Sequence, residues 1–599
     1  MKDLIVLDCE VYPNYFLVAF KNIDTGKIVT IEAKGKDNTL SDSDAIRLRT
    51  IMYKRNTFGF NSNNYDMSII LKALRKSSCS EIHRLSDEII NKGLCGWQSR
   101  QAHNLILPIE IHHFDIIEPS PGVQVSLKLY GARMHAKHLQ DLPIAPGTHL
   151  TEQQMEDIKL YCINDLDTTI LLYRKIEGRM QLRFDMVKDH GEVVLSKSDA
   201  QIAELVIKSQ LDSSRAKPPK LRHDTSYEYI TPGYISFRSQ ELKDLLYLIE
   251  NHRFELDAKG SIKLPKELSS KKIKLGYSTY KIGIGGIHST ESRQSIIPTE
   301  NQLLVDKDVA SYYPSIILNL GLYPKHLGEI FLRIYENIVK RRLIAKKTGD
   351  KIVNEALKIV INGSFGKFGN RFSALYSPDL MMKVTLTGQL AILMLIEKLE
   401  DAGVNVMSAN TDGFVSLMPK DKYDEYERIC KAWQTRTKFD LEESRYKALY
   451  SRDVNNYLAI TDYGHKGKGV FTLSELSKNP QGDISVIAVI DYLTKNIPIT
   501  KTIRECKDVT KFLLVRSVTG GAVWRGEYLG RVVRWIYSTD GEEIRRNKLK
   551  ENQSQGDKVA KSDGARPIMT LGEFPSDIDY NKYIKESMDI LDGLGLLDF

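Results

Sequence analysis

The chain has 599 residues and a formal net charge of +8, from 85 lysines and arginines against 77 aspartates and glutamates. This length predicts several domains, and the mild positive charge fits nucleic-acid binding without proving it, because ordinary enzymes often carry as much. The six cysteines form no CxxC pair, which argues against a zinc site or disulfides and fits a reducing compartment. We expect no membrane partner, because residues 1–7 are too short for a signal peptide and no apolar run approaches membrane-spanning length.

The first predicted element is a strand over residues 4–10 that carries two acids. Because side chains alternate along a strand, Asp8 and Glu10 share one face. Such a pair is costly to bury unless it binds a cation. Further along, Asp66 opens an apolar helix, where it is as well suited to capping the helix as to catalysis.

A capping box at residues 151–154 predicts the start of another helix. This helix places Tyr161 and Asp165 one turn apart on one face. The amphipathic segment 126–130 precedes it, a pattern that usually reflects core packing. Nothing pairs with His112 and His113 at ligand spacing, so we interpret both as structural.

The region from 186 to 300 carries fewer signals. Residues 211–220 read as a polar, proline-bearing linker. Residues 283–286, Gly-Ile-Gly-Gly, lack the glycine spacing of a dinucleotide-binding loop, and a glycine-rich turn between strands explains them equally well.

Asp308 follows an apolar strand and precedes a Tyr-Tyr-Pro-Ser turn. Taken alone, it would more often be a turn or capping residue. A second acid, Asp412, stands in an Asp-Gly hairpin turn between two apolar runs. Two carboxylates on neighbouring strands can hold two Mg²⁺ ions, and this pairing favours the metal-site interpretation.

A basic helix over residues 333–347 leads into a second helix, and such a charge run is usually a solvated face. The second helix has Lys358 and Asn362 one turn apart, where the lysine can meet a triphosphate. Glycines 363 and 366 would let a base pair approach the backbone. A further apolar helix is expected at about 386–401, and residues 545–567 form a polar stretch.

These motifs together resemble the family B DNA polymerases. Residues 308–315 are similar to motif A of that family and residues 358–366 to motif B, with Gly363 and Phe365 at its serine and tyrosine positions. Residues 410–413 are similar to motif C, with Asn410 in place of the first aspartate.

The N-terminal acids resemble the DEDDy 3′→5′ exonucleases that proofread for this family. The resemblance implies that four carboxylates hold two metal ions and that a tyrosine orients the attacking water: Asp8, Glu10, Asp66, Asp165 and Tyr161. It also implies that four residues contact the DNA strand end: Asn61, Tyr65, Ser126 and Leu127.

For polymerisation, the resemblance implies metal binding by Asp308, Asp412 and the backbone carbonyl of Val309. It implies that the incoming nucleotide contacts Tyr313, Arg342, Lys358 and Asn362, with Arg341 nearly as well placed as Arg342. The implied DNA contacts are Gly285, Gly286, Tyr457 and Lys468, although Gly283 and Asn455 replace a tyrosine and a lysine of the family pattern.

The fold implied is an α/β and α+β multidomain chain with a ribonuclease H-like exonuclease domain and a right-hand polymerase. The expected domains are an exonuclease at 1–185, a linker and start of the palm at 186–299, palm at 300–325 and 373–465, fingers at 326–372, and thumb at 466–599. Because the first exonuclease motif begins at residue 8, the large N-terminal domain of many members is expected to be missing. Short forms of this kind resemble phage or mobile-element replicases, which act in the cytoplasm of a bacterial host.

The sequence thus predicts a monomeric DNA-directed DNA polymerase with a proofreading exonuclease and two Mg²⁺ per site, for which Mn²⁺ can substitute. Its partners would be primer–template DNA, deoxynucleoside triphosphates and replisome proteins such as a helicase and a single-strand binding protein. The alternative is a DNA-binding protein or nuclease with a decayed polymerase site, which the departures from the family pattern at 363, 410 and 455 allow. Retention of both metal aspartates, Lys358, Asn362 and the exonuclease acids argues against it.

Overall fold

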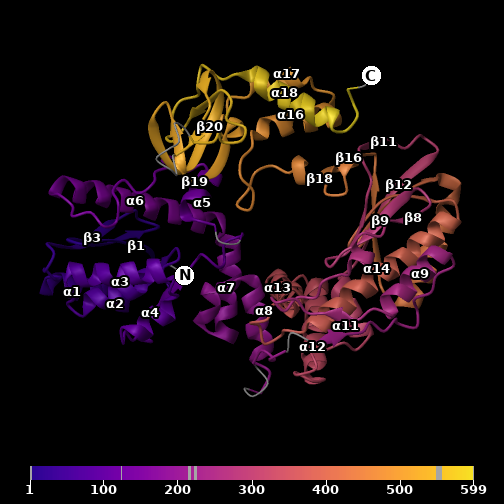
Figure 1. Ribbon diagram of the computed structural model, residues 1–599, viewed down its shortest axis with the longest axis horizontal. Coiled ribbons are helices and arrows are strands. Elements are labelled where there is room, and N and C mark those ends of the chain that lie inside the picture. The colour runs from indigo at the N-terminus through magenta and orange to yellow at the C-terminus, as the bar shows by residue number, and fades with distance from the viewer. Residues whose placement is uncertain (1–2, 123–124, 213–216, 222–224, 548–555, 598–599) are drawn as a thin grey trace. The chain divides into compact units, whose positions relative to one another are not determined.

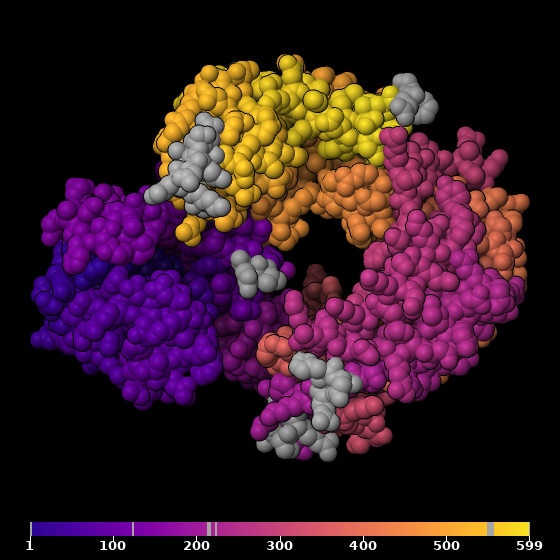
Figure 2. All heavy atoms as spheres, in the orientation of Figure 1, coloured from indigo at the N-terminus to yellow at the C-terminus, as the bar shows by residue number. Residues whose placement is uncertain are grey.

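The computed structural model describes residues 3–122, 125–212, 217–221, 225–547 and 556–597 (Figure 1), which appear as coloured atoms in Figure 2. The chain divides into two compact units. Unit 1 comprises residues 1–198, 473–487 and 500–585, and unit 2 comprises residues 199–472, 488–499 and 586–599. The predicted linker and the polar stretch near the C-terminus fall partly outside the described residues.

Unit 1 is built on a five-stranded sheet of order β3-β2-β1-β4-β5. Its strands are β1 (Leu4–Tyr12), β2 (Tyr15–Asn22), β3 (Ile28–Lys34), β4 (Asn56–Gly59) and β5 (His113–Asp115). The pairs β1–β2 and β2–β3 are antiparallel, whereas β1–β4 and β4–β5 are parallel. This order and these directions are those of a ribonuclease H-like sheet, as expected.

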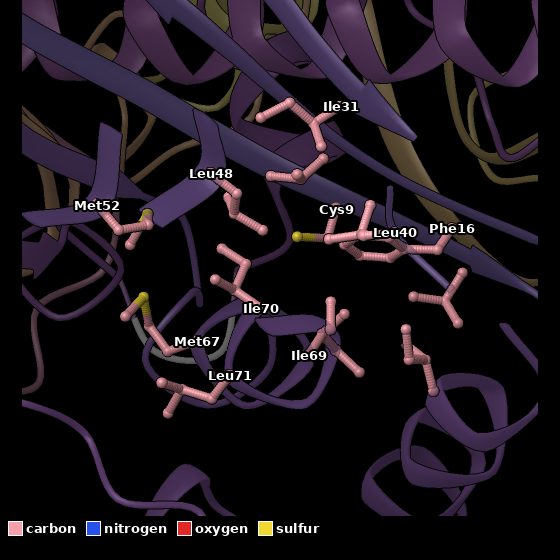
Figure 3. Packing of buried hydrophobic residues seen from close by; sticks show 14 of the residues in the cluster. Cys9, Phe16, Ile31, Leu40, Leu48, Met52, Met67, Ile69, Ile70 and Leu71 are labelled. Carbon is pink, nitrogen blue, oxygen red and sulfur yellow. The ribbon is translucent and has the colours of Figure 1, made fainter. Parts of the chain in front are cut away.

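Helices cover both faces of this sheet. They are α1 (Asp42–Lys54), α2 (Asp66–Leu74), α3 (Cys79–Lys92), α4 (Gly96–Ala102), α5 (Leu127–Arg133), α6 (Glu152–Lys175) and α7 (Glu177–His190). Alternation along β1 sends Leu7 and Cys9 into the core with α1, α2 and α3, as Figure 3 shows for Cys9. It sends Val6 to the opposite core with α6. Asp8 and Glu10 therefore face α6.

The C-terminal part of unit 1 contains a second sheet, of order β21-β19-β20-β22. Its strands are β19 (Leu514–Trp524), β20 (Glu527–Glu542), β21 (Arg545–Arg546) and β22 (Ala565–Pro567). Val515 of this sheet packs with Ala132 of α5. The buried Arg534 guanidinium donates to the carbonyls of Ala136 and Ile568, so this sheet is attached to the N-terminal part of unit 1 through Ala136.

Unit 2 contains an antiparallel sheet of order β13-β14-β12-β15. Its strands are β12 (Gln302–Val309), β13 (Asn405–Asn410), β14 (Gly413–Pro419) and β15 (Leu441–Tyr446). Two helices, α14 (Pro378–Asp401) and α15 (Tyr423–Thr437), pack together, and the Trp433 indole of α15 donates to the Ala391 carbonyl of α14.

Two smaller sheets complete the strands around this one. The first has order β11-β16-β17-β18 and consists of β11 (Gln294–Ile296), β16 (Ala448–Asp453), β17 (Asn456–Thr461) and β18 (Gly464–Lys468). The second has order β10-β9-β8 and consists of β8 (Ile273–Leu275), β9 (Ser278–Ile282) and β10 (Ile287–Ser289). The predicted domain boundaries stay predictions. Strand β18 crosses the predicted boundary between palm and thumb, which lies between residues 465 and 466.

The helical part of unit 2 consists of α8 (Asp199–Lys208), α11 (Tyr312–Asn319), α12 (Ile330–Thr348) and α13 (Lys351–Phe368), with α9 (Gln240–Glu250) and α10 (Lys266–Ser269) elsewhere in the unit. The remaining helices are α16 (Asp483–Lys495), α17 (Ile499–Glu505) and α18 (Tyr580–Asp592). Together the two units confirm the expected mixed α/β and α+β multidomain fold.

Two expectations about α13 and α14 were wrong. A Cβ at Gly363 would lie 2.9 Å from the Ala203 Cβ of α8, so this glycine serves close helix packing rather than approach of a base pair. Helix α14 begins at Pro378, well before residue 386, because proline suits the first turn of a helix. The expectation that no apolar run approaches membrane-spanning length was also wrong. Within the described residues, α14 is long and apolar enough to cross a membrane, although 89% of its apolar window is buried, as in a core helix.

Candidate active sites

The hairpin between β13 and β14 brings Asp412 next to the end of β12. Asp308 of β12 pairs with Gly413, and the Val309 amide donates to the Asp412 carbonyl at 2.7 Å. Burial, followed by the Asp308 charge, raises the pKa of the Asp412 carboxyl. Asp308 lies inside the strand, and Ser311 is the residue that precedes α11, so the capping alternative for Asp308 was wrong.

Two further charged residues surround Asp308. Asp306 lies one strand repeat earlier, is buried, and accepts a hydrogen bond from the Tyr446 hydroxyl. The Lys466 Nζ lies 3.5 Å from Asp306 Oδ2 and 3.9 Å from Asp308 Oδ2. Burial would lower the pKa of Lys466, but Asp306, Tyr457 and Asp308 raise it overall. The sequence did not reveal Lys466, whose only signal was its place in the basic Lys-Gly-Lys segment at 466–468.

Asn410 of motif C and the predicted DNA contacts lie beside the same acids. Asn410 and Tyr457 line one small hollow together with Asp306 and Asp308. Tyr457 pairs with Lys468 across β17 and β18. The 283–286 turn also approaches the motif C turn, because a Cβ on Gly286 would lie 2.5 Å from Thr411 Oγ1. The structure thus joins residues that are far apart in the sequence.

Tyr313 forms one wall next to this turn. Its hydroxyl donates to the Gly285 carbonyl at 2.6 Å, and its ring stacks on Phe365 of α13 with centroids 4.2 Å apart. Tyr312 is buried instead, and its hydroxyl donates to the Gly388 carbonyl at 2.6 Å. Tyr313 is therefore the tyrosine of this pair that is available to a ligand.

The predicted nucleotide-binding residues of α12 and α13 contact the rest of the site less closely than Tyr313 does. Arg342 Nη1 lies 3.4 Å from the Ser311 hydroxyl, and Ser311 has a left-handed backbone with φ of 48° at the junction of strand and helix. This contact favours Arg342 over the exposed Arg341. Lys358 and Asn362 are exposed on α13, and Lys358 pairs with Glu355 at 3.5 Å. Their contact with a nucleotide stays a prediction.

The predicted metal-binding acids of the N-terminal region gather in unit 1 between β1, α2 and α6. Ligand atoms of Asp8, Glu10 and Cys162 all lie within 4.8 Å of one another. Asp66 Oδ1 accepts from the Cys9 amide at 2.9 Å, which ties the start of α2 to β1. The residue in the N-cap position of α2 is Tyr65, and its side chain makes no capping bond, so Asp66 is not the cap.

Burial and mutual repulsion disfavour ionisation of this acid cluster. Burial, and then the charges of Asp66 and Glu10, raise the pKa of Asp8. Burial, followed by Asp165, raises the pKa of Glu10 to about 8, and burial raises that of Asp66 to about 7. Carboxylate oxygens are the ligands that Mg²⁺ prefers, and a bound cation would offset this repulsion, so the donor set fits a divalent metal.

Lys128 is a member of this site that the sequence did not reveal. Its Nζ donates to the Tyr161 hydroxyl, lies 3.3 Å from Asp165 Oδ2 and sits 4.0 Å from the centroid of the Tyr161 ring. Tyr161 and Asp165 lie on α6, whereas Lys128 lies on α5. Packing of α5 against α6 is therefore what supplies the ammonium group to this site.

The predicted strand-end contacts all have partners within the protein. Ser126 caps α5 by accepting from the Leu129 amide, and Leu127 packs against the core beside α6. The Asn61 side chain accepts from Asn64, and the Tyr65 hydroxyl contacts Ser86. Their contact with DNA stays a prediction.

His113 and His112 have the structural roles expected of them. The half-buried His113 ring contacts the Thr57 and Ser62 hydroxyls at 2.9 and 2.8 Å, whereas His112 pairs with Glu192 at 3.0 Å.

Comparisons with known proteins give partial matches. No protein-family model matches the chain. DNA polymerase 1 of Saccharolobus solfataricus is 30% identical over 115 residues, which are 19% of this chain and 13% of that protein. DNA polymerase 1 of Aeropyrum pernix is 29% identical over 135 residues, 20% of this chain and 14% of that protein. DNA polymerase II of Escherichia coli is 29% identical over 150 residues, 21% of this chain and 19% of that protein.

The matched stretches therefore span less than a fifth of each of these three relatives. A solved structure of the family B DNA polymerase from Pyrobaculum calidifontis is similar over 100% of this chain and 78% of its own, at 13% identity. Its TM-score of 0.41 is too low to establish a shared fold. The three matched relatives are all DNA polymerases, the class of enzyme that the motifs predict.

Proposed function

We propose that this chain is a family B DNA-directed DNA polymerase that extends a primer 3′ end with deoxynucleoside triphosphates and carries its own 3′→5′ exonuclease. The observation that carries the proposal is the pair Asp308 and Asp412, which are brought together at the ends of two paired strands beside Tyr313. The carboxylates would hold two Mg²⁺ ions, assisted by the Val309 carbonyl. When bound, such ions activate the attacking hydroxyl and stabilise the leaving oxygen.

The remaining residues of unit 2 position the reactants. Tyr313 is held by its stack on Phe365 and its bond to Gly285, so its ring forms a rigid support for the sugar. Arg342 and Lys358 would meet the triphosphate, where negative charge develops during phosphoryl transfer. Lys466 neutralises part of the negative charge of Asp306 and Asp308.

The second activity would use the acid cluster of unit 1. Asp8, Glu10, Asp66 and Asp165 would hold the metal ions for hydrolysis of the terminal phosphodiester. Tyr161 would orient the attacking water through its hydroxyl, which Lys128 contacts. We further propose a phage or mobile-element replicase that acts as a monomer in the cytoplasm of a bacterial host, together with a helicase and a single-strand binding protein.

Primer extension on a primed single-stranded circle with Mg²⁺ and four deoxynucleotides tests the proposal. Extension by the native chain, and its loss in Asp412→Asn, is the expected result. DNA binding without extension, restored by Asn410→Asp, would instead identify a decayed polymerase site. The packing of Gly363 against α8 removes one of the three departures on which that alternative depended.

A further inference from the structure

A large cavity in unit 2 lies outside both acid sites. It has a volume of about 820 Å³, within the range of pockets that hold nucleotide-sized ligands, and its lining is mostly apolar. Three segments form it: the 283–286 turn, the end of α13 with the following loop to Phe372, and the first turns of α14. A fourth segment, residues 259–264, closes one side. None of the proposed metal ligands lines it.

The side chains around this cavity suit a nucleobase and its phosphates. The Phe372 ring is 76% exposed, and Ile284 on the opposite segment is 45% exposed. The Arg371 guanidinium lies over the Phe372 ring, 4.8 Å from its centroid. Arg371 and Lys259 are the charged residues of the lining, and none of the lining residues is acidic. Aromatic surface beside basic groups is the combination that holds single-stranded nucleic acid.

The cavity adjoins the proposed nucleotide site through two short backbone connections. Tyr313 donates to the Gly285 carbonyl, while Gly283 and Ile284 line the cavity. Tyr313 also stacks on Phe365, and the next residue, Gly366, lines the cavity. The cavity therefore begins one or two residues beyond each contact that Tyr313 makes.

The wall shared with the nucleotide site is rigid. The Gln389 side chain of α14 accepts from the Gly283 amide and donates to the Gly283 carbonyl, both at 2.9 Å. Because this pair of bonds clamps the turn to a buried helix, the cavity is formed before any ligand binds.

We propose that this cavity receives the unpaired template base that follows the base being copied, with its ring against Phe372 and its phosphate near Arg371 and Lys259. The inference rests on the proposed polymerase function. A template strand that enters a polymerase site must separate the base being copied from the next one. The cavity offers an apolar seat for that next base on the far side of the wall that carries Tyr313.

The test is a binding cycle between the template and Phe372. The full chain is titrated with primer–template DNA whose terminal primer linkage is a phosphorothioate, with either an intact base or an abasic site next to the base being copied. Wild type is expected to bind the abasic template about tenfold more weakly, since stacking of a base on an aromatic ring contributes about 1–3 kcal/mol. Phe372→Ala is expected to bind the intact template about tenfold more weakly than wild type does, and to bind the intact and abasic templates with equal affinity.

Two controls make the result specific. Tyr247→Ala removes another exposed ring of unit 2, on α9, and should keep the wild-type response to the lesion. Ile284→Trp places a bulky ring in the cavity while keeping Phe372, and should reduce the difference in affinity between the intact and abasic templates. The proposal would be overturned if the abasic site weakened binding equally in Phe372→Ala and in wild type. It would also be overturned if an abasic site several positions further along the template weakened binding as strongly as the adjacent one. In both cases primer extension would persist. Failure of the native chain to extend any primer would overturn the proposed function itself.

Discussion

The Asp308 carboxylate occupies the space that a side chain at Gly413 would need. A Cβ on Gly413 would lie 1.9 Å from Asp308 Oδ1 and 3.1 Å from the Lys307 carbonyl. Gly413 is not among the residues with positive φ, so space rather than backbone conformation requires the glycine. The glycine of this Asp-Gly turn therefore leaves room for the Asp308 carboxylate, which is the proposed metal ligand on the neighbouring strand.

Gly413→Ala should displace the Asp308 carboxylate and lower the rate of primer extension about 100-fold, because a shift of about 1 Å in a catalytic group can cost that much. Thermal stability and 3′→5′ degradation should stay close to wild type. Gly233→Ala is the matched control in unit 2, because a Cβ there would meet nothing within 4 Å. Normal extension by Gly413→Ala would show that Asp308 is not required in this position.

Substitution of Asp308 should impair primer extension far more than substitution of Asp306. Asp306 is buried and already bonded to Tyr446, whereas the Asp308 side chain is 46% exposed and available to a cation. Asp308→Asn should abolish extension, whereas Asp306→Asn should lower it about tenfold, as is usual for a residue that supports a ligand. Steady-state extension rates at several Mg²⁺ concentrations measure both. Loss of extension in Asp306→Asn with only a mild effect in Asp308→Asn would identify Asp306 rather than Asp308 as the metal ligand.

The acid cluster of unit 1 should make the metal-free protein less stable as the pH rises. The folded-state pKa of Glu10, about 8, and of Asp66, about 7, lie above their ordinary values. The folded protein therefore binds more protons than the unfolded chain, and this contribution to stability is lost as the pH rises through 7 and 8. Thermal unfolding in chelator from pH 6 to 8.5 should show a falling Tm, and added Mg²⁺ should restore it.

The double variant Asp8→Asn with Glu10→Gln is the control for that experiment. It should have a higher Tm than wild type in chelator at pH 8, by about 2–4 °C for each kcal/mol of repulsion removed. It should also lose most of its response to Mg²⁺ and all 3′→5′ degradation, and keep primer extension. Loss of extension to the same degree would contradict the separation of the two sites.

The sequence predicted the parts of both sites that local rules govern. Strand alternation placed Asp8 and Glu10 on one face, helix spacing placed Tyr161 beside Asp165, and the Asp-Gly turn located Asp412. It could not reveal contacts set by packing between distant segments. Lys128 reaches Tyr161 only because α5 packs on α6, and Lys466 reaches Asp308 only through the register of β18.

Tyr313→Ala should reduce discrimination against ribonucleotides. The wild-type ring is fixed between Phe365 and the Gly285 carbonyl, so it cannot yield to a 2′-hydroxyl. Removing the ring should raise the ratio of ribonucleotide to deoxynucleotide kcat/KM by at least about tenfold, the scale of a lost steric contact in a pocket. Tyr312→Phe keeps the buried ring and should leave the ratio unchanged. An unchanged ratio in Tyr313→Ala would place the discrimination elsewhere.

Lys128→Met should impair the exonuclease while leaving polymerisation intact. Methionine keeps the apolar length of the side chain but removes the ammonium group that contacts the Tyr161 hydroxyl and Asp165. Without it, the tyrosine loses the partner that orients it, and 3′→5′ degradation should fall about 10- to 100-fold. Lys128→Arg should recover part of the activity, because it restores the charge with a different geometry.

Lys137→Met, which removes an exposed lysine of unit 1, should behave as wild type. Single-turnover degradation of single-stranded DNA, compared with primer extension by the same preparations, separates a positioning role from general misfolding. Equal loss of both activities in Lys128→Met, or a rate of degradation that does not change, would contradict the role assigned to Lys128.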